Sequence, residues 1–273
     1  MAVAHTQIAA PFDAIAERYD ETFTTSKIGR AQRASVWKEL EKAFCPGDRV
    51  LEIGCGTGVD ACFLADRGVE VIACDNSPQM IAVTTRRVTQ GDRLGLVYPR
   101  LLAAEDVSAL RNGDFFDGAF SNFGALNCVE DIQQFARDLA ALLKPGATAL
   151  LCSMGPCCWW ELVWYLVHAR PDKAFRRLRR GGVTARLTDG TAIRVRYPSV
   201  RLLRRTFAPE FRLVSIKGIG VSVPPSYLED CASRFPRLFE LSIRADSVLG
   251  YCPGTRVLAD HVLLEFQRED PHV

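Results

Sequence analysis

Short apolar runs alternate with longer stretches of helical periodicity along most of this chain of 273 residues. Runs of four to eight apolar residues are typical of buried strands, and an i, i+3, i+4 pattern is typical of helices. Strands are predicted at residues 49–53, 70–75, 100–103, 118–122, 148–153, 212–219 and 261–267. Helices are predicted at residues 31–44, 58–66, 77–89, 132–143 and 227–238. This alternation predicts an α/β fold, a parallel sheet with helices on both faces.

The first predicted strand leads into a glycine-rich loop, Gly54-Cys55-Gly56-Thr57-Gly58, and then into a helix. Glycines at alternate positions let the backbone turn sharply and approach a bound ligand, because no Cβ stands in the way. The dinucleotide fingerprint G-x-G-x-x-G is not met, since Val59 occupies the place of its third glycine. The second predicted strand ends in Asp75, a carboxylate suited to accept hydrogen bonds from both hydroxyls of a ribose.

With Glu52 before it and Asp75 after it, this loop resembles the motifs of class I S-adenosylmethionine-dependent methyltransferases. The resemblance covers about residues 12–153. It implies a Rossmann-like, seven-stranded, mostly parallel sheet whose last strand is antiparallel, and it implies S-adenosyl-L-methionine as the cofactor. A Rossmann-type loop that holds another nucleotide is the alternative.

The resemblance also implies which residues contact the cofactor. They are Tyr19, Glu52, Gly54, Cys55, Gly56, Gly58, Asp75, Asn76, Met80, Glu105, Asp106, Asn122 and Phe123. Glu52 is expected beneath the methionine ammonium, and Asn76 and Met80 beside the adenine. Where the family usually has D-A-[ED], this chain has Ala103-Ala104-Glu105-Asp106. The leading aspartate is missing, so Glu105 or Asp106 is left to hold the adenine amine.

The segment from Phe12 to Asp20 resembles the F-D-x-x-A-x-x-Y-D opening of small-molecule members such as ubiquinone- and biotin-pathway methyltransferases. In those enzymes the helix covers the cofactor and its tyrosine contacts the methionine end. The resemblance implies a helical lid over residues 1–45 and this contact for Tyr19. The alternative is an amphipathic helix that only packs on the core.

Residues 155–210 are predicted to be an insertion between the fifth and sixth strands, which caps the active site in the resembled fold. The remaining core would then comprise residues 46–154 and 211–273, within one domain spanning residues 1–273. The insertion opens with a helix that is apolar nearly all round, in which Trp160 and Trp164 share one face. We expect these tryptophans to wall the acceptor pocket, the alternative being a core helix. A hairpin about Gly190 is predicted after it.

The net charge is only +2, but residues 170–205 carry eleven Arg and one Lys against two Asp. Such a block is either a solvated surface or a site for an acidic substrate, a lipid surface or nucleic acid. The chain has no apolar run long enough for a membrane span, and its start lacks the features of a signal peptide, so a cytoplasmic location is expected. Ten cysteines without a C-x-x-C pair and four scattered histidines predict reduced thiols and no metal site.

Methyl transfer is an in-line displacement that mainly requires positioning and exclusion of water, so the catalytic residues are weakly marked. Tyr19 and Asn127 are candidates to orient the acceptor. Glu161 is the sole charge in its apolar helix and is the candidate base, with a pKa raised by burial. The alternative is a glutamate that faces water.

The predicted function is methylation of a small, largely apolar molecule, acidic or lipid-like, with peripheral lipid contact and an undetermined oligomeric state. RNA methylation through the basic block is one alternative, disfavoured because no N-P-P-[YF] motif occurs and aromatic residues do not interleave with the basic ones. A methyltransferase-like scaffold without activity is another, disfavoured by the intact glycine loop.

Overall fold

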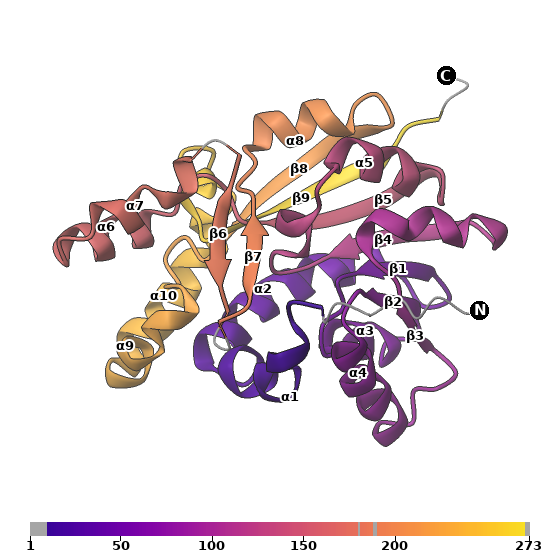
Figure 1. The fold of residues 1–273 in the computed structure, drawn as a ribbon, viewed down its shortest axis with the longest axis horizontal. Coiled ribbons are helices and arrows are strands. Elements are labelled where there is room, and N and C mark those ends of the chain that lie inside the picture. Colours follow the sequence, from indigo (N-terminus) through magenta and orange to yellow (C-terminus); the bar gives the residue numbers. More distant parts are fainter. Residues whose placement is uncertain (1–9, 180, 188–189, 271–273) are drawn as a thin grey trace, which may run out of the picture.

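The computed structural model describes residues 10–179, 181–187 and 190–270. Its centre is a seven-stranded sheet in the order β3-β2-β1-β4-β5-β9-β8 (Figure 1). The strands are β1 (Arg49–Ile53), β2 (Glu70–Asp75), β3 (Val97–Leu101), β4 (Phe116–Ser121), β5 (Leu143–Ser153), β8 (Phe211–Ile219) and β9 (His261–Arg268). β9 runs antiparallel to β5 and β8, whereas the other neighbours are parallel. The predicted fold class is confirmed.

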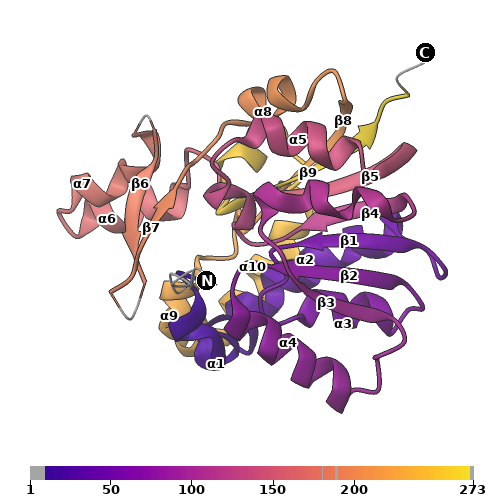
Figure 2. The same cartoon turned by 45° about the vertical axis from the view of Figure 1, so that its right-hand side comes forward.

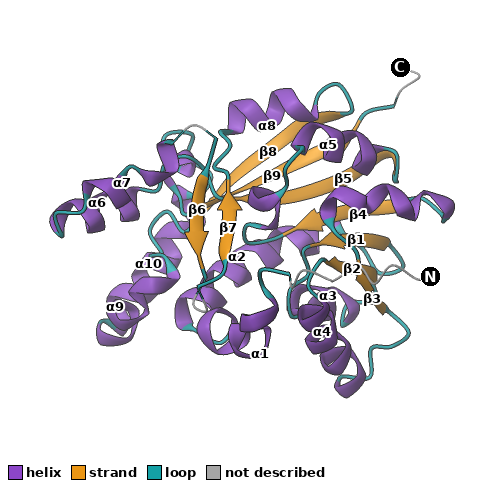
Figure 3. Ribbon diagram, viewed as in Figure 1, coloured by secondary structure: helices purple, strands orange, loops and turns teal. Residues whose placement is uncertain are grey.

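Helices cover both faces of this sheet (Figure 3). They are α1 (Ala16–Tyr19), α2 (Lys27–Ala43), α3 (Val59–Ala65), α4 (Pro78–Gln90), α5 (Ile132–Ala140), α6 (Trp159–Val167), α7 (Pro171–Ala174), α8 (Val200–Phe207), α9 (Glu229–Arg234) and α10 (Pro236–Leu249). Short helical turns are η1 (Asp13–Ile15), η2 (Asp20–Thr24), η3 (Ala104–Asn112), η4 (Ala125–Cys128), η5 (Arg176–Leu178), η6 (Ser226–Leu228) and η7 (Arg256–Leu258). Leu51 packs in a cluster with Phe135 of α5 and Phe207 of α8, whereas Val50 packs in one with Leu40 of α2. Successive residues of these strands point to opposite faces of the sheet, and both faces are covered by helices. The strands therefore appear in the sequence as unbroken apolar runs.

The predicted hairpin is present, as β6 (Val183–Arg186) and β7 (Ala192–Val195). It stands apart from the main sheet, on the same side of the molecule as α6 and α7 (Figure 2). Residues 188 and 189 of its predicted turn lie outside the described residues. The hairpin therefore belongs to the insertion and adds no strand to the central sheet.

Several predicted boundaries differ from the structure: α2 begins at Lys27 and β5 at Leu143, each earlier than predicted. β3 begins at Val97 and contains Pro99, which an edge strand tolerates because it needs no hydrogen bond on its outer side. The single helix predicted at 227–238 is divided at Pro236, which lacks a backbone N–H and starts α10. α5 ends at Ala140, three residues short of the prediction.

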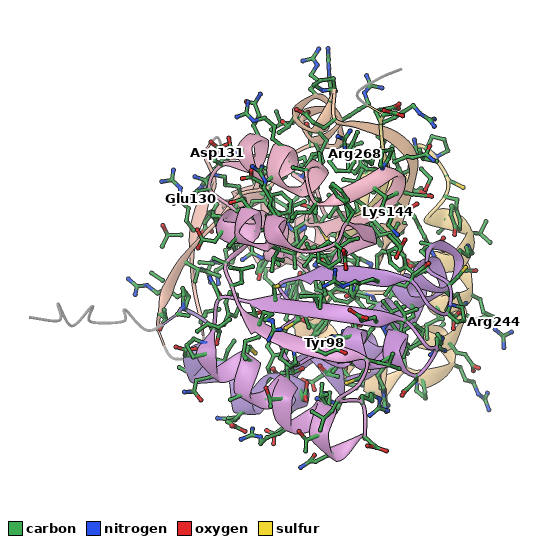
Figure 4. All side chains as sticks on the ribbon, turned by 90° about the vertical axis from the view of Figure 1, so that its right-hand side faces the viewer. Tyr98, Glu130, Asp131, Lys144, Arg244 and Arg268 are labelled. Atoms are coloured by element: carbon green, nitrogen blue, oxygen red, sulfur yellow. The ribbon has the colours of Figure 1, made fainter. Side chains whose placement is uncertain are left out.

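Two helices, α8 and α5, have a polar side chain that caps their N-terminus. α8 was absent from the prediction, although Ser199 caps it by accepting a hydrogen bond from the backbone N–H of Leu202. α5 is preceded by Asp131, which is exposed at the surface and caps the helix by accepting hydrogen bonds from two backbone N–H groups of the first turn (Figure 4). In the described part of the chain, none of the helices has both the length and the apolar content required to cross a bilayer.

Candidate active site

A cavity of about 420 Å³ lies where the glycine loop, the N-terminal segment and the β6–β7 hairpin meet. One side is formed by Gly54, Gly56, Asp75, Asn76 and Met80, at the carboxyl ends of β1 and β2. The opposite side is formed by Arg176, Ala185, Ile193, Val195 and Tyr197. Small-molecule sites in open α/β sheets lie at this edge, and the volume is in their usual range.

The three glycines of the loop all have positive φ angles, 71°, 54° and 72° at Gly54, Gly56 and Gly58. A Cβ on Gly54 would lie 2.2 Å from the Cβ of Ala125, and one on Gly58 would lie 2.5 Å from Cγ2 of Thr84. Nothing lies within 4 Å of the corresponding point at Gly56, which lines the cavity. Two glycines are thus required for packing, and Gly56 leaves open the space that a ligand would occupy.

Asp75 joins the two loops at this edge of the sheet. Its Oδ2 accepts a hydrogen bond from the backbone N–H of Gly56, and its Oδ1 accepts one from Ser77, both at 2.9 Å. Burial raises the pKa of this carboxyl above its ordinary value, although these N–H groups act in the other direction. Asp75 also lines the cavity, so the carboxylate is placed to meet a ligand.

The N-terminal segment covers part of the cavity with Phe12 and Tyr19, both of which line it. Burial raises the pKa of the Tyr19 hydroxyl above its ordinary value. Tyr19 is therefore placed as a cofactor contact or an acceptor-orienting group requires. Residues 1–9 of the predicted lid lie outside the described part of the chain.

The two aspartates of the same motif attach this segment to the core. Asp13 accepts a hydrogen bond from the hydroxyl of Ser77 at the start of α4. Asp20 accepts one of 2.7 Å from the hydroxyl of Thr57 in the glycine loop, and it pairs with Arg87. The sequence motif thus combines cavity-lining aromatic residues with the carboxylates that hold them in place.

A buried charged group lies beneath the loop, and it was not predicted from the sequence. Arg33 pairs with Asp60 at 2.6 Å, and Asn122 donates from Nδ2 to the same carboxylate at 2.9 Å. Burial and the nearby Asp60 raise the pKa of Glu52 well above its ordinary value. Glu52 does not line the cavity, whereas Asn122 does. No local pattern joins Arg33 to Asp60, because they come from α2 and α3.

Three buried polar atoms of this group have no hydrogen-bond partner among the described residues. They are the donor Nε of Arg33 and the acceptors Oε2 of Glu52 and Oδ1 of Asn122. A buried acceptor without a donor costs free energy, so a donor supplied by a ligand would be favoured there. Asn122 lines the cavity, and an ammonium or hydroxyl group of the expected cofactor would supply such a donor.

The other predicted cofactor residues divide into two groups. Asn76, Met80, Glu105 and Phe123 line the cavity. Cys55, Gly58 and Asp106 do not line it. Of the two acidic residues left to hold the adenine amine, only Glu105 is therefore at the cavity.

Asn127 is not placed for catalysis, contrary to the prediction. It is fully buried, and its side chain bonds to the backbone of Met154 on both sides, at 2.8 and 2.9 Å. It also donates to the backbone oxygen of Arg196 at 2.6 Å. Its amide is saturated and lies outside the cavity lining. Asn127 thus attaches the segment after β7 to the end of β5.

The prediction that Glu161 is a base with a raised pKa is wrong. Glu161 is 2% exposed and bonds to Arg176 at 2.6 Å and to Arg177 at 2.8 Å. Burial raises the pKa of this carboxyl, but the two arginines outweigh burial, and the pKa is below its ordinary value. Arg177 also forms an ion pair with Asp260, at 2.7 Å. Glu161 is therefore the centre of a buried ionic network, which sequence could not reveal because its partners come from other elements.

Trp160 and Trp164 do not line the cavity either. They pack against a cluster formed by Ile28, Val223, Leu228 and Ala232, and Trp160 donates to the backbone oxygen of Val221 at 3.1 Å. The apolar helix α6 therefore packs on α2 and α9, which agrees with the alternative that it is a core helix. The insertion reaches the cavity through the β6–β7 hairpin and Arg176, and this arginine was hidden among the eleven of the basic block.

Comparisons with known proteins agree with this geometry. Residues 50–146 match the family model described as a methyltransferase domain. The demethylmenaquinone methyltransferase of Clavibacter sepedonicus is 32% identical over 146 residues, which cover 54% of this chain and 57% of the relative. The demethylmenaquinone methyltransferase of Parafrankia sp. (strain EAN1pec) is 31% identical over 189 residues, which cover 62% of this chain and 72% of the relative.

The matched segment thus spans little more than half the length of the Clavibacter relative. Among solved structures, the CcbJ methyltransferase from Streptomyces caelestis superimposes with a TM-score of 0.63 at 18% identity, covering 96% of this chain and 99% of that one. This likeness shows the fold alone. The glycine loop, the sheet order and the Parafrankia match together place this chain in the family of class I S-adenosylmethionine-dependent methyltransferases.

Proposed function

We propose that this chain transfers a methyl group from S-adenosylmethionine to a small, largely apolar acceptor. The observation that carries the proposal is the single cavity bounded by the glycine loop and Asp75 on one side and by the hairpin on the other. Gly56 and Asp75 are assigned to the ribose and methionine parts of the cofactor, and Met80 and Glu105 to the adenine. Bound there, S-adenosylmethionine supplies an electrophilic methyl group on a sulfonium.

The residues of the chain then have to position the acceptor and exclude water. Phe12, Tyr19 and Phe123 cover the cavity with aromatic surface. Phe123 is held from the other side by the guanidinium of Arg33, 5.1 Å from its ring centre, and by His261. A positive sulfonium that becomes a neutral thioether is favoured in such a weakly polar site.

The acceptor side points to a flat molecule that carries an oxygen. Ala185, Ile193 and Val195 give apolar surface, and Arg176 supplies the positive charge. Several relatives are named demethylmenaquinone methyltransferases. We therefore propose a quinone-like or phenolic acceptor, with its oxygen toward Arg176.

Three arginines of the basic block are engaged within the chain. Arg177 pairs with Glu161 and Asp260, and Arg194 and Arg196 donate to backbone oxygens. RNA binding needs cations that are free to meet phosphates, and these three are not. A reducing, cytoplasmic location is part of the proposal, and the ten cysteines would then remain thiols.

The proposal is tested by calorimetry with S-adenosylmethionine, followed by measurement of S-adenosylhomocysteine formation with a panel of acceptors. We expect cofactor binding, and turnover with lipophilic phenols or quinols but not with amines or a structured RNA. Cofactor binding without turnover on any acceptor would support an inactive scaffold instead. Absence of cofactor binding would contradict the assignment of the cavity.

Replacing Arg176 with glutamine is expected to raise the acceptor KM about tenfold, since one charge-assisted hydrogen bond to the acceptor is lost. Cofactor affinity should not change, because Arg176 lies on the hairpin side of the cavity. Steady-state kinetics with each substrate varied in turn measures both. Arg179→Gln is the matched control, an exposed arginine that does not line the cavity. Equal acceptor KM values in the two variants would remove Arg176 from the acceptor site.

A further inference from the structure

A second cavity, of about 450 Å³, lies between α8, η7 and the strands β8 and β9. Figure 1 shows α8 alongside these two strands, at the β8 edge of the sheet. None of its lining residues belongs to the lining of the candidate active site. We call this cavity the α8 groove.

The floor of the α8 groove is apolar. It consists of Leu203, Leu213, Ile216, Val262 and Leu264. Leu203 and the two β9 residues are almost fully buried, and Leu213 and Ile216 are partly exposed. Leu213 and Ile216 therefore offer aliphatic surface to the apolar body of a ligand, and the buried residues support them from below.

Three arginines line the same groove: Arg201 and Arg204 of α8, and Arg256 of η7. No aspartate or glutamate is among the lining residues. Elsewhere in this protein arginines are commonly paired, yet none of these three forms an ion pair with any described residue. The groove therefore concentrates positive charge beside an apolar floor without an internal counter-ion.

Arg256 adds an independent observation. Its Nε is buried and has no hydrogen-bond partner among the described residues. A buried N–H donor without an acceptor is costly, and a carboxylate or phosphate oxygen would satisfy it. The planar guanidinium is also the side chain best suited to bind such groups through two bonds.

The α8 groove adjoins the candidate active site at two places along the chain. Ser153 faces the groove, and the next residue, Met154, lines the active-site cavity. Likewise, Pro198 lines the groove, and the residue before it, Tyr197, lines the active-site cavity. A ligand in the groove would thus lie directly behind the acceptor side of the active site.

We infer that the α8 groove is a second binding site, for an amphipathic anion. Its apolar body lies on the floor formed by β8 and β9, and its carboxylate or phosphate is held by Arg201, Arg204 and Arg256. The ligand class is that of medium- or long-chain acyl carboxylates and alkyl phosphates, either free or presented by a lipid. This site is independent of the proposed methyl transfer and of the cofactor.

The test is calorimetry of the whole chain with four probes: decanoate, decyl phosphate, decanol and inorganic phosphate. Decanoate and decyl phosphate should bind. Decanol and inorganic phosphate should bind much more weakly, because decanol lacks the anionic group and inorganic phosphate lacks the apolar chain. Vesicles with and without an anionic phospholipid distinguish a lipid source from a free anion. Binding only to the vesicles would assign the site to headgroups.

Matched variants locate the binding. Arg204→Gln and Arg256→Gln should each weaken decanoate binding about tenfold, whereas Arg205→Gln, the neighbouring exposed arginine of α8 outside the groove, should not. Arg176→Gln should not either, since it acts in the other cavity. Arg201→Gln replaces Arg256→Gln if the latter lowers the melting temperature. Equal binding by the Arg204 and Arg205 variants, or loss of decanoate binding in Arg176→Gln, would overturn the inference.

Discussion

Replacing Asp75 with alanine is expected to weaken S-adenosylmethionine binding roughly 30- to 150-fold, or about 2–3 kcal/mol. The carboxylate is expected to accept two hydrogen bonds from the ribose. It also fixes the backbone N–H groups of Gly56 and Ser77, so its removal loosens both loops at the cavity edge. Isothermal titration calorimetry of the variant and the unaltered protein measures the difference directly.

Asp106→Ala is the control for this experiment. Asp106 is an exposed acidic residue close to the cavity, and it does not line it. Its removal should leave the dissociation constant unchanged, which separates a specific contact from a change in local charge. If the Asp75 variant bound the cofactor as tightly as the Asp106 variant does, the ribose assignment would be wrong.

The second large effect is expected on stability. Glu161→Ala should lower the free energy of unfolding by about 3–5 kcal/mol, because it leaves the buried guanidinium of Arg177 with fewer counter-charges. Glu161 and Arg177 have side chains only 2% and 4% exposed, so water cannot replace the lost partner. Urea unfolding followed by circular dichroism measures the difference. Glu240→Ala removes an exposed partner of Arg244 and should have almost no effect.

This network also sets a pH dependence. Burial raises the pKa of Glu161, but Arg177 and Arg176 lower it below its ordinary value. Burial also raises the pKa of Asp260, but His261 and Arg177 lower it below its ordinary value. A carboxyl whose pKa is lower in the folded than in the unfolded state stabilises the folded protein at pH values above the unfolded-state pKa. This stabilisation is lost as the pH falls through the folded-state pKa. Stability should therefore decline below about pH 4. Glu161→Ala should show a shallower decline over the same range, and an identical decline would contradict the assigned ionic network.

The cofactor side of the site was predictable because its residues are close in sequence. Gly54, Gly56 and Asp75 are fixed by two consecutive strands and the turn between them, so motif and spacing locate them. The acceptor side was not predictable in the same way. Arg176 reaches the cavity because Glu161 holds it. Glu161 is also bonded to Arg177, which is bonded to Asp260, 83 residues after Arg177 in the chain.

The same contrast holds for the fold. The apolar runs of the buried strands predicted the sheet, because residues buried on both faces leave a strong signal. The apolar helix α6 also gave a strong signal, but periodicity could not say which partner would cover it. Trp160 packs toward α2 and α9 instead of the acceptor, because Val223 and Leu228 form the complementary surface there.

The two covers of the active site are attached by interactions of different strength. Asp20 and Arg87, which hold the N-terminal segment, are 26% and 32% exposed, and water can compete for such pairs. Asn127 and Glu161, which hold the insertion, are almost fully buried. On this comparison, the N-terminal segment is expected to detach at lower cost than the hairpin. Substrate entry and product release would then take place on the N-terminal side, while the wall that selects the acceptor keeps its shape from one turnover to the next.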